Sequence, residues 1–183
     1  MDEEVEQWMK KLEEMKKGSM DLSRDEDLSI GLMNLISLEE HLYFTAMKTN
    51  EKKYLHMLNS VRSTRTSLMK NIVEDPKGEE WCISKHLLAA SMRFMEVGTK
   101  ELGQGKQESA NAFFNKAFDL YSLFFAINLK MLDNVDFETL SLSPIKGGAP
   151  LRGGASSLDN SQNPLMGKIS SVIKDIVNCC KEW

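Results

Sequence analysis

Three charged side chains interrupt the apolar stripes of expected helices: Glu39, Arg65 and Lys85. A buried charge is costly unless it is paired and hydrogen-bonded, so charges on neighbouring helices are expected to pair with one another. Arg62 and Arg93 would widen this set into a basic cluster. We favour a structural interpretation, in which these charges pair within the protein or, for Lys and Arg, reach solvent from the edge of a stripe. The alternative is an anion pocket for phosphate or carboxylate, where Arg offers two parallel hydrogen bonds.

Cys82 and His86 form a second candidate site. Their four-residue separation puts both side chains on one face of a helix, as two ligands of a tetrahedral metal require. Further ligands would come from His41, His56 or nearby acids, which stand at no recognisable metal-ligand spacing. A nucleophile–base pair at these positions would lack a third, orienting group. We therefore assign no metal, cofactor or catalytic residue and keep Cys82 and His86 as weak metal candidates.

A basic face is expected on the helix that follows Asn50. Between residues 48 and 70 the chain has six bases and one acid. The side chains that could contact nucleic-acid phosphates are Lys48, Lys52, Lys53, Arg62 and Lys70. Tyr43 and Tyr54 stand nearby for stacking, but no recognised nucleic-acid-binding motif accompanies them. Residues 1–27, with ten acids and five bases, could pair with this face instead.

Helical periodicity runs through residues 23–137, without strand-like alternation. Apolar residues recur every three or four positions in four segments joined by short links. We predict an all-α fold, a four-helix antiparallel bundle over residues 23–137. The segment from Gln107 to Leu132 is the most apolar and is expected to centre the core. In the preceding segment, Ser91 and Gly98 would let neighbouring helices approach closely.

Two more amphipathic helices are expected, over residues 1–18 and 165–183. A flexible linker rich in Gly, Pro and Ser, residues 141–164, precedes the second. A short isolated helix is marginal in water, so each must bury its stripe against this chain or another protein. The side chains expected to dock are Leu165, Ile169, Val172, Ile173, Ile176 and Trp183.

The composition is that of a globular protein, with 42% hydrophobic and 27% charged residues. A net charge of −4 is not typical of a general nucleic-acid binder. Three Cys, two of them adjacent, make a poor disulfide framework and indicate a reducing compartment. We expect a cytoplasmic protein with no signal peptide and no membrane span.

These observations favour a non-enzymatic interaction protein, a small helical adaptor or accessory subunit of a larger assembly. Its partner would be another protein, or a second copy of itself, bound through the terminal helices. The alternative is a nucleic-acid- or ribonucleoprotein-associated factor that uses the basic face. A metal- or anion-binding bundle is a third interpretation. No motif in the chain identifies a family.

Overall fold

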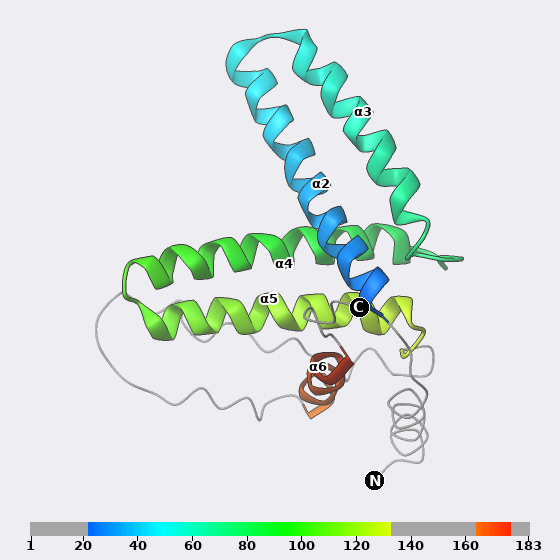
Figure 1. Cartoon of the computed structure of the whole chain (residues 1–183), viewed down its shortest axis with the longest axis vertical. Coiled ribbons are helices and arrows are strands. Elements are labelled where there is room, and N and C mark those ends of the chain that lie inside the picture. The colour runs from blue at the N-terminus through cyan, green and yellow to red at the C-terminus, as the bar shows by residue number, and fades with distance from the viewer. Residues whose placement is uncertain (1–21, 133–163, 177–183) are drawn as a thin grey trace.

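The computed structural model describes residues 22–132 and 164–176. Within these ranges the chain forms five α-helices and no strand (Figure 1). They are α2 (Ser23–Thr49), α3 (Lys52–Met69), α4 (Glu80–Gly103), α5 (Gln107–Asn128) and α6 (Pro164–Ile176). The predicted all-α class is confirmed. The helix predicted over residues 1–18 and nearly all of the predicted linker lie outside the described residues.

A short turn folds α2 and α3 into an antiparallel hairpin. Asn50 adopts a left-handed conformation, with φ 55°, and its N–H donates to the carbonyl of Ala46 at 2.8 Å. A left-handed residue ends a helix while satisfying a carbonyl of the last turn, and Asn tolerates this conformation better than most side chains. Glu51 is extended, and α3 begins at the next residue. The apolar spacing of the first expected helix predicts its end at Thr49–Asn50, and this is confirmed.

Small residues bring α4 and α5 into close contact. The Ser91 hydroxyl donates to the carbonyl of Ala117 at 2.7 Å. At Gly98, an added Cβ would stand 2.6 Å from Cε1 of the Phe114 ring. The link between the two helices turns at Gly105, whose φ of 74° favours glycine. The predicted close approach at Ser91 and Gly98 is confirmed.

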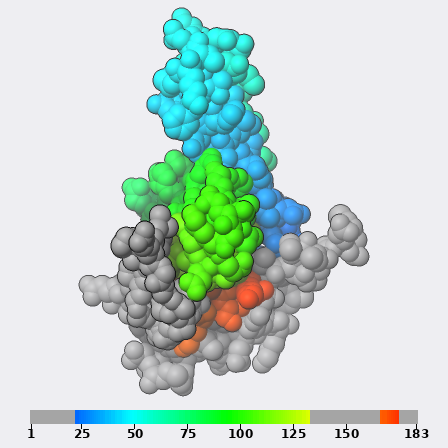
Figure 2. Space-filling model, turned by 90° about the vertical axis from the view of Figure 1, so that its left-hand side faces the viewer, coloured from blue at the N-terminus to red at the C-terminus, as the bar shows by residue number. Residues whose placement is uncertain are grey.

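The two hairpins cross instead of lying side by side. α2 runs steeply across α4 and α5, so the α2–α3 hairpin extends well beyond them (Figure 1, Figure 2). A bundle of four parallel axes would need a second buried face on α3. Only Arg65 and Met69 of α3 are buried, and much of its remaining surface consists of exposed Lys, Ser, Thr and Asn. The antiparallel bundle predicted over residues 23–137 is therefore seen only as two antiparallel pairs, with α2 contacting α4.

α2 packs on the α4–α5 hairpin through its first half. Ser29 donates to the carbonyl of Glu26 at 2.6 Å, and its Oγ lies 2.7 Å from the Tyr121 hydroxyl of α5. With the Ser29 proton engaged, Tyr121 donates and Ser29 accepts. Burial raises the pKa of Tyr121 to about 12, because the charged phenolate would lose its solvation. Met33, one turn along α2, is also buried.

The core is centred on α5, as its aromatic residues predict. Phe124 and Phe125 are almost completely buried, and their rings meet edge to face with centroids 5.3 Å apart. Leu32 of α2, Leu88 of α4 and Ile173 of α6 belong to the same buried cluster. Met69 at the end of α3 is also fully buried in this cluster, so all four other described helices contribute fully buried side chains around α5.

α6 packs on α5 of the same chain. Its buried side chains are Met166, Ile169, Val172 and Ile173. The Ser170 hydroxyl also donates to Oδ1 of Asp119 on α5 at 3.0 Å. Of the two destinations left open for this helix, its own chain is the one seen. The side chains of Leu165 and Ile176, and all of Trp183, lie outside the described residues.

Candidate functional site

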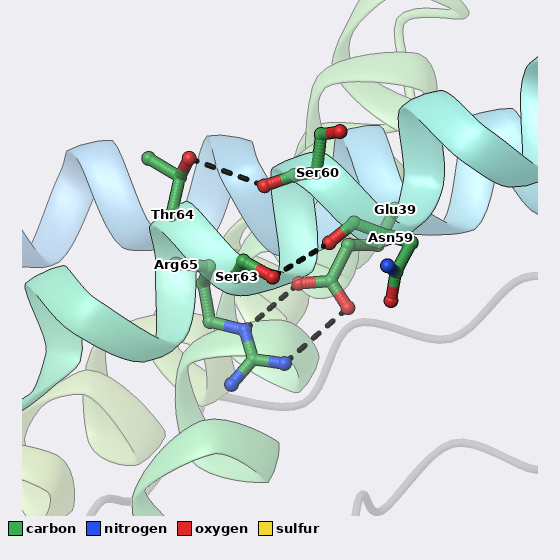
Figure 3. A network of polar contacts seen from close by, with 6 residues as sticks. All are labelled: Glu39, Asn59, Ser60, Ser63, Thr64 and Arg65. Atoms are coloured by element: carbon green, nitrogen blue, oxygen red, sulfur yellow. Dashed lines mark hydrogen bonds and ion pairs between the residues drawn. The ribbon is translucent and has the colours of Figure 1, made fainter.

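A buried ion pair joins the two helices of the α2–α3 hairpin. Nε of Arg65 donates to Oε1 of Glu39 at 2.8 Å, and Nη2 donates to Oε2 at 3.3 Å (Figure 3). The side chain of Arg65 is only 4% exposed and that of Glu39 16%. Both carboxylate oxygens accept from one guanidinium, the geometry that best offsets the loss of solvation. The predicted pairing of these two residues is present.

The other members of the predicted polar cluster do not join this pair. Arg93 of α4 bonds to Glu40 of α2 at 2.8 Å, and both side chains are nearly half exposed. Lys85 is half-buried on α4 and Arg62 is exposed on α3. Neither has an ion-pair partner among the described residues. Among the described residues, the set therefore divides into separate contacts.

The hydroxyl groups next to this pair on α3 are engaged within their own helix. Ser63 donates to the carbonyl of Asn59 at 3.0 Å, and Thr64 donates to the carbonyl of Ser60 at 3.2 Å (Figure 3). Such i−4 bonds satisfy the hydroxyls locally. They leave the ion pair as the polar link between α2 and α3 in this region.

Cys82 and His86 are both exposed on α4. Within residues 22–132 and 164–176, no group of three or more His, Cys, Asp or Glu side chains is close enough to hold a metal ion. His41 and His56, the other imidazoles considered as ligands, are exposed on the α2–α3 hairpin. Among the described residues, no further ligand is therefore close to Cys82 and His86.

The residues of the predicted basic face are all exposed. Lys53 pairs with Glu51 and its Nζ lies 5.0 Å from the centroid of the Tyr54 ring. Lys48 and Lys52 have no ion-pair partner among the described residues. The same holds for Arg62. Lys48 and Lys52 flank the turn at the end of the hairpin, whereas Lys70 follows the opposite end of α3.

Large apolar side chains are exposed on the same part of the hairpin. Tyr43, Phe44 and Met47 of α2 are 48%, 50% and 56% exposed. The rings of Tyr43 and Phe44 meet edge to face, with centroids 5.3 Å apart. Leu55 and Met57 of α3 are exposed to a similar extent. We call Tyr43, Phe44 and Met47 the apolar hairpin face.

This face continues a stripe of α2 that is buried lower in the molecule. Met33, Ile36, Glu40 and Met47 recur at three-, four- and seven-residue spacing, which places them on one side of the helix. Met33 is buried, Ile36 packs against the main core, and Glu40 reaches Arg93 of α4. Beyond that contact, about half of the surface of Tyr43, Phe44 and Met47 is exposed. The crossing of the two hairpins leaves the upper part of the stripe in solvent.

A depression of about 620 Å³ lies beside the connection between α3 and α4. Its lining residues are Lys70, Val73, Glu74, Asp75, Pro76 and Trp81. Beside Trp81, Glu80 accepts hydrogen bonds from Nζ of Lys130 at 2.9 Å and from the N–H of Lys77 at 2.8 Å. The bond from Lys130 lowers the pKa of Glu80. These contacts hold the turn in place, and the lining forms no recognisable nucleophile–base or paired-acid set.

The apolar hairpin face was missed by the sequence reasoning. From the sequence, Tyr43 is given only a stacking role, and Phe44 and Met47 are given none. The available signal was the doublet Tyr43-Phe44 followed by Met47, a second apolar side on a helix that already had one. Two apolar sides predict burial on two sides, so only the three-dimensional arrangement reveals the exposure.

Comparison of the chain with known protein families, with curated proteins and with solved structures finds no match. In the described part of the chain, none of the helices is both long and apolar enough to cross a membrane.

Proposed function

We propose that this protein is a non-enzymatic interaction protein, a small helical adaptor or accessory subunit of a larger assembly. Its docking surface is the apolar hairpin face. The observation that carries this proposal is the continuity of the α2 stripe, which is buried at Met33 and exposed at Phe44 and Met47. A clustered apolar surface on an extended element is typical of protein interaction sites. This places the proposed surface on the hairpin and not on the terminal helices, because the described apolar side chains of α6 are buried against the same chain.

The geometry of the hairpin supports the proposal. It extends beyond the α4–α5 pair, so a partner can reach it without meeting the rest of the molecule (Figure 2). The buried Glu39–Arg65 pair holds its two helices together just below the apolar face. Because the ion pair holds the two helices together, the apolar hairpin face loses little conformational freedom when a partner binds. The exposed thiol of Cys82 fits a reducing compartment such as the cytoplasm.

Affinity purification of paired variants from the native source tests the proposal. The apolar variant carries Tyr43→Ser, Phe44→Ser and Met47→Ser. The matched control carries Ile83→Ser and Met95→Ser, two α4 side chains of similar exposure. The wild type and the control should retain the same partner proteins, and the apolar variant should lose them. Retention of the same partners by the apolar variant, with an unchanged circular dichroism spectrum, would exclude the hairpin as the docking surface.

A nucleic-acid-associated factor is the second candidate, favoured by Lys48, Lys52 and Arg62, which have no acidic partner among the described residues. Phosphate contacts release counterions, so such binding weakens steeply as salt rises. Binding of RNA and DNA oligonucleotides is measured at 50 and at about 200 mM salt. Absence of a salt-dependent affinity excludes this candidate.

A further inference from the structure

The charges left without partners around the apolar hairpin face all have one sign. The three acids between residues 38 and 66 are each engaged: Glu39 with Arg65, Glu40 with Arg93, and Glu51 with Lys53. Three bases of the same stretch have no ion-pair partner among the described residues: Lys48, Lys52 and Arg62. The whole chain carries a net charge of −4, so the charge of this region is opposite in sign to that of the chain.

These bases lie beside the apolar residues. Lys48 follows Phe44 by four positions and so shares its side of α2. Lys52 begins α3, directly after the turn at Asn50 and Glu51. The register of the antiparallel pair is set by the contact between Glu39 and Arg65. Arg62 lies three residues before Arg65, and Leu42 lies three residues after Glu39. In an antiparallel pair this puts Arg62 and Leu42 at the same height along the hairpin, and Tyr43 follows Leu42 directly.

The shape of the surface is suited to binding a helix. The backbone of α2 and α3 is engaged in its own hydrogen bonds, so the hairpin offers no strand edge to an extended peptide. Two packed helices do offer an elongated surface, on which the apolar stripe of a third helix can lie. The same stripe of α2 already packs on another helix where it crosses α4.

We propose, building on the hairpin as the docking surface, that its partner supplies an acidic amphipathic helix. The apolar side of that helix packs on Tyr43, Phe44 and Met47. Its Asp and Glu side chains face Lys48, Lys52 and Arg62, which otherwise have no counter-charge in the described chain. Complementary charge of this kind selects partners and speeds association more than it adds affinity.

Two other occupants fit the surface less well. A second copy of the hairpin would bring three positive side chains against three of the same sign, which opposes association. A nucleic acid would satisfy the bases, and the rings of Tyr43 and Phe44 could stack, but Met47 offers no flat surface for a base. An acidic helix uses the apolar and the charged residues together.

A selection experiment on the full chain tests the proposal. A displayed library of helical peptides, with an apolar stripe and random Asp, Glu, Lys, Arg, Gln and Ser elsewhere, is selected against the wild-type protein. We expect the enriched peptides to be net acidic. Their binding should weaken at least about tenfold in a charge variant carrying Lys48→Glu, Lys52→Glu and Arg62→Glu, and should weaken as salt rises. A control with Lys70→Glu and Lys174→Glu, two exposed bases away from the face, should bind as the wild type does.

The outcomes separate the partner's chemistry from the docking surface itself. Enriched peptides that bind the apolar variant as well as the wild type would refute the proposed function. Peptides that lose binding to the apolar variant, but are neutral or basic, would refute only the acidic partner. An oligonucleotide that binds more tightly than every selected peptide and competes with it would also refute it, in favour of nucleic acid. A wild-type dimer in sedimentation analysis, absent in the apolar variant, would refute it in favour of a second copy.

Discussion

Removing one member of the buried ion pair tests what holds the hairpin together. In Glu39→Leu, Arg65, whose side chain is only 4% exposed in the wild type, loses its carboxylate partner. Breaking a buried pair costs about 3–5 kcal/mol, and the lower end applies because the Glu39 position admits some water. We expect the free energy of unfolding, measured by urea denaturation, to fall by about 3 kcal/mol. The melting temperature should fall by about 6–12 °C.

The double variant and a neighbouring control decide whether this reasoning is right. Arg65→Leu alone should cost about 2 kcal/mol. The double variant should cost about 2–3 kcal/mol instead of the sum of about 5 kcal/mol, which is a coupling energy of about 2–3 kcal/mol. Glu40→Leu breaks the exposed contact with Arg93 and should cost less than about 1 kcal/mol. The reasoning is refuted if Glu39→Leu costs no more than Glu40→Leu, or if the two single losses simply add.

Four further variants probe the packing of the helices. Gly98→Ala should lose about 1 kcal/mol in urea denaturation, because its Cβ would overlap the Phe114 ring, whereas Gly31→Ala meets no atom within 4 Å and should gain up to about 1 kcal/mol. Tyr121→Phe should cost about 1 kcal/mol at neutral pH by removing the bond to Ser29. The pKa of Tyr121 is raised from 10.0 to about 12, so the unfolded chain releases this proton first. The wild type should therefore lose about 2 kcal/mol more than Tyr121→Phe as the pH rises from 10 to 12, and equal losses would contradict the burial of the phenol. Ile169→Asp should free α6, so that amide hydrogen exchange speeds up in α6 but not in α3, and protection unchanged in α6 would count against its docking on α5.

Local chemistry made the helices predictable. Asn50 and Gly105 adopt left-handed backbone angles that few residues tolerate, and α2 and α4 each end within two residues before them. The apolar spacing after Asn50 continues to Val73 and so predicts a helix up to that residue, but α3 ends at Met69. Ile72 and Val73 remain buried after it, as parts of a turn. Apolar spacing therefore extended the prediction past the true helix end, since burial continues where helical geometry does not.

The candidate site was predictable only where two helices run alongside each other. Glu39 and Arg65 each interrupt an apolar stripe on consecutive antiparallel helices, so their pairing follows from spacing alone. Lys85 was grouped with them on the assumption that α4 runs parallel to the hairpin. Because α2 crosses α4 at a steep angle, the two helices meet over a short length. A hydrophobic pattern tells which side of a helix is buried, but not how far along that side the neighbouring helix extends.

The same crossing explains why the apolar hairpin face and the buried ion pair occur together. Beyond α4, each helix of the hairpin has only the other for support, and α3 buries just two side chains, Arg65 and Met69. A pair of helices with so little shared apolar surface is marginal unless a specific contact adds to it. The bidentate bond between Glu39 and Arg65 is that contact. A partner helix that covers Phe44 and Met47 would bury apolar surface in the part of the hairpin that buries least. Binding should therefore stabilise the hairpin itself. Amide hydrogen exchange in the half of the hairpin near Asn50 should slow in proportion to the fraction of protein that has bound partner.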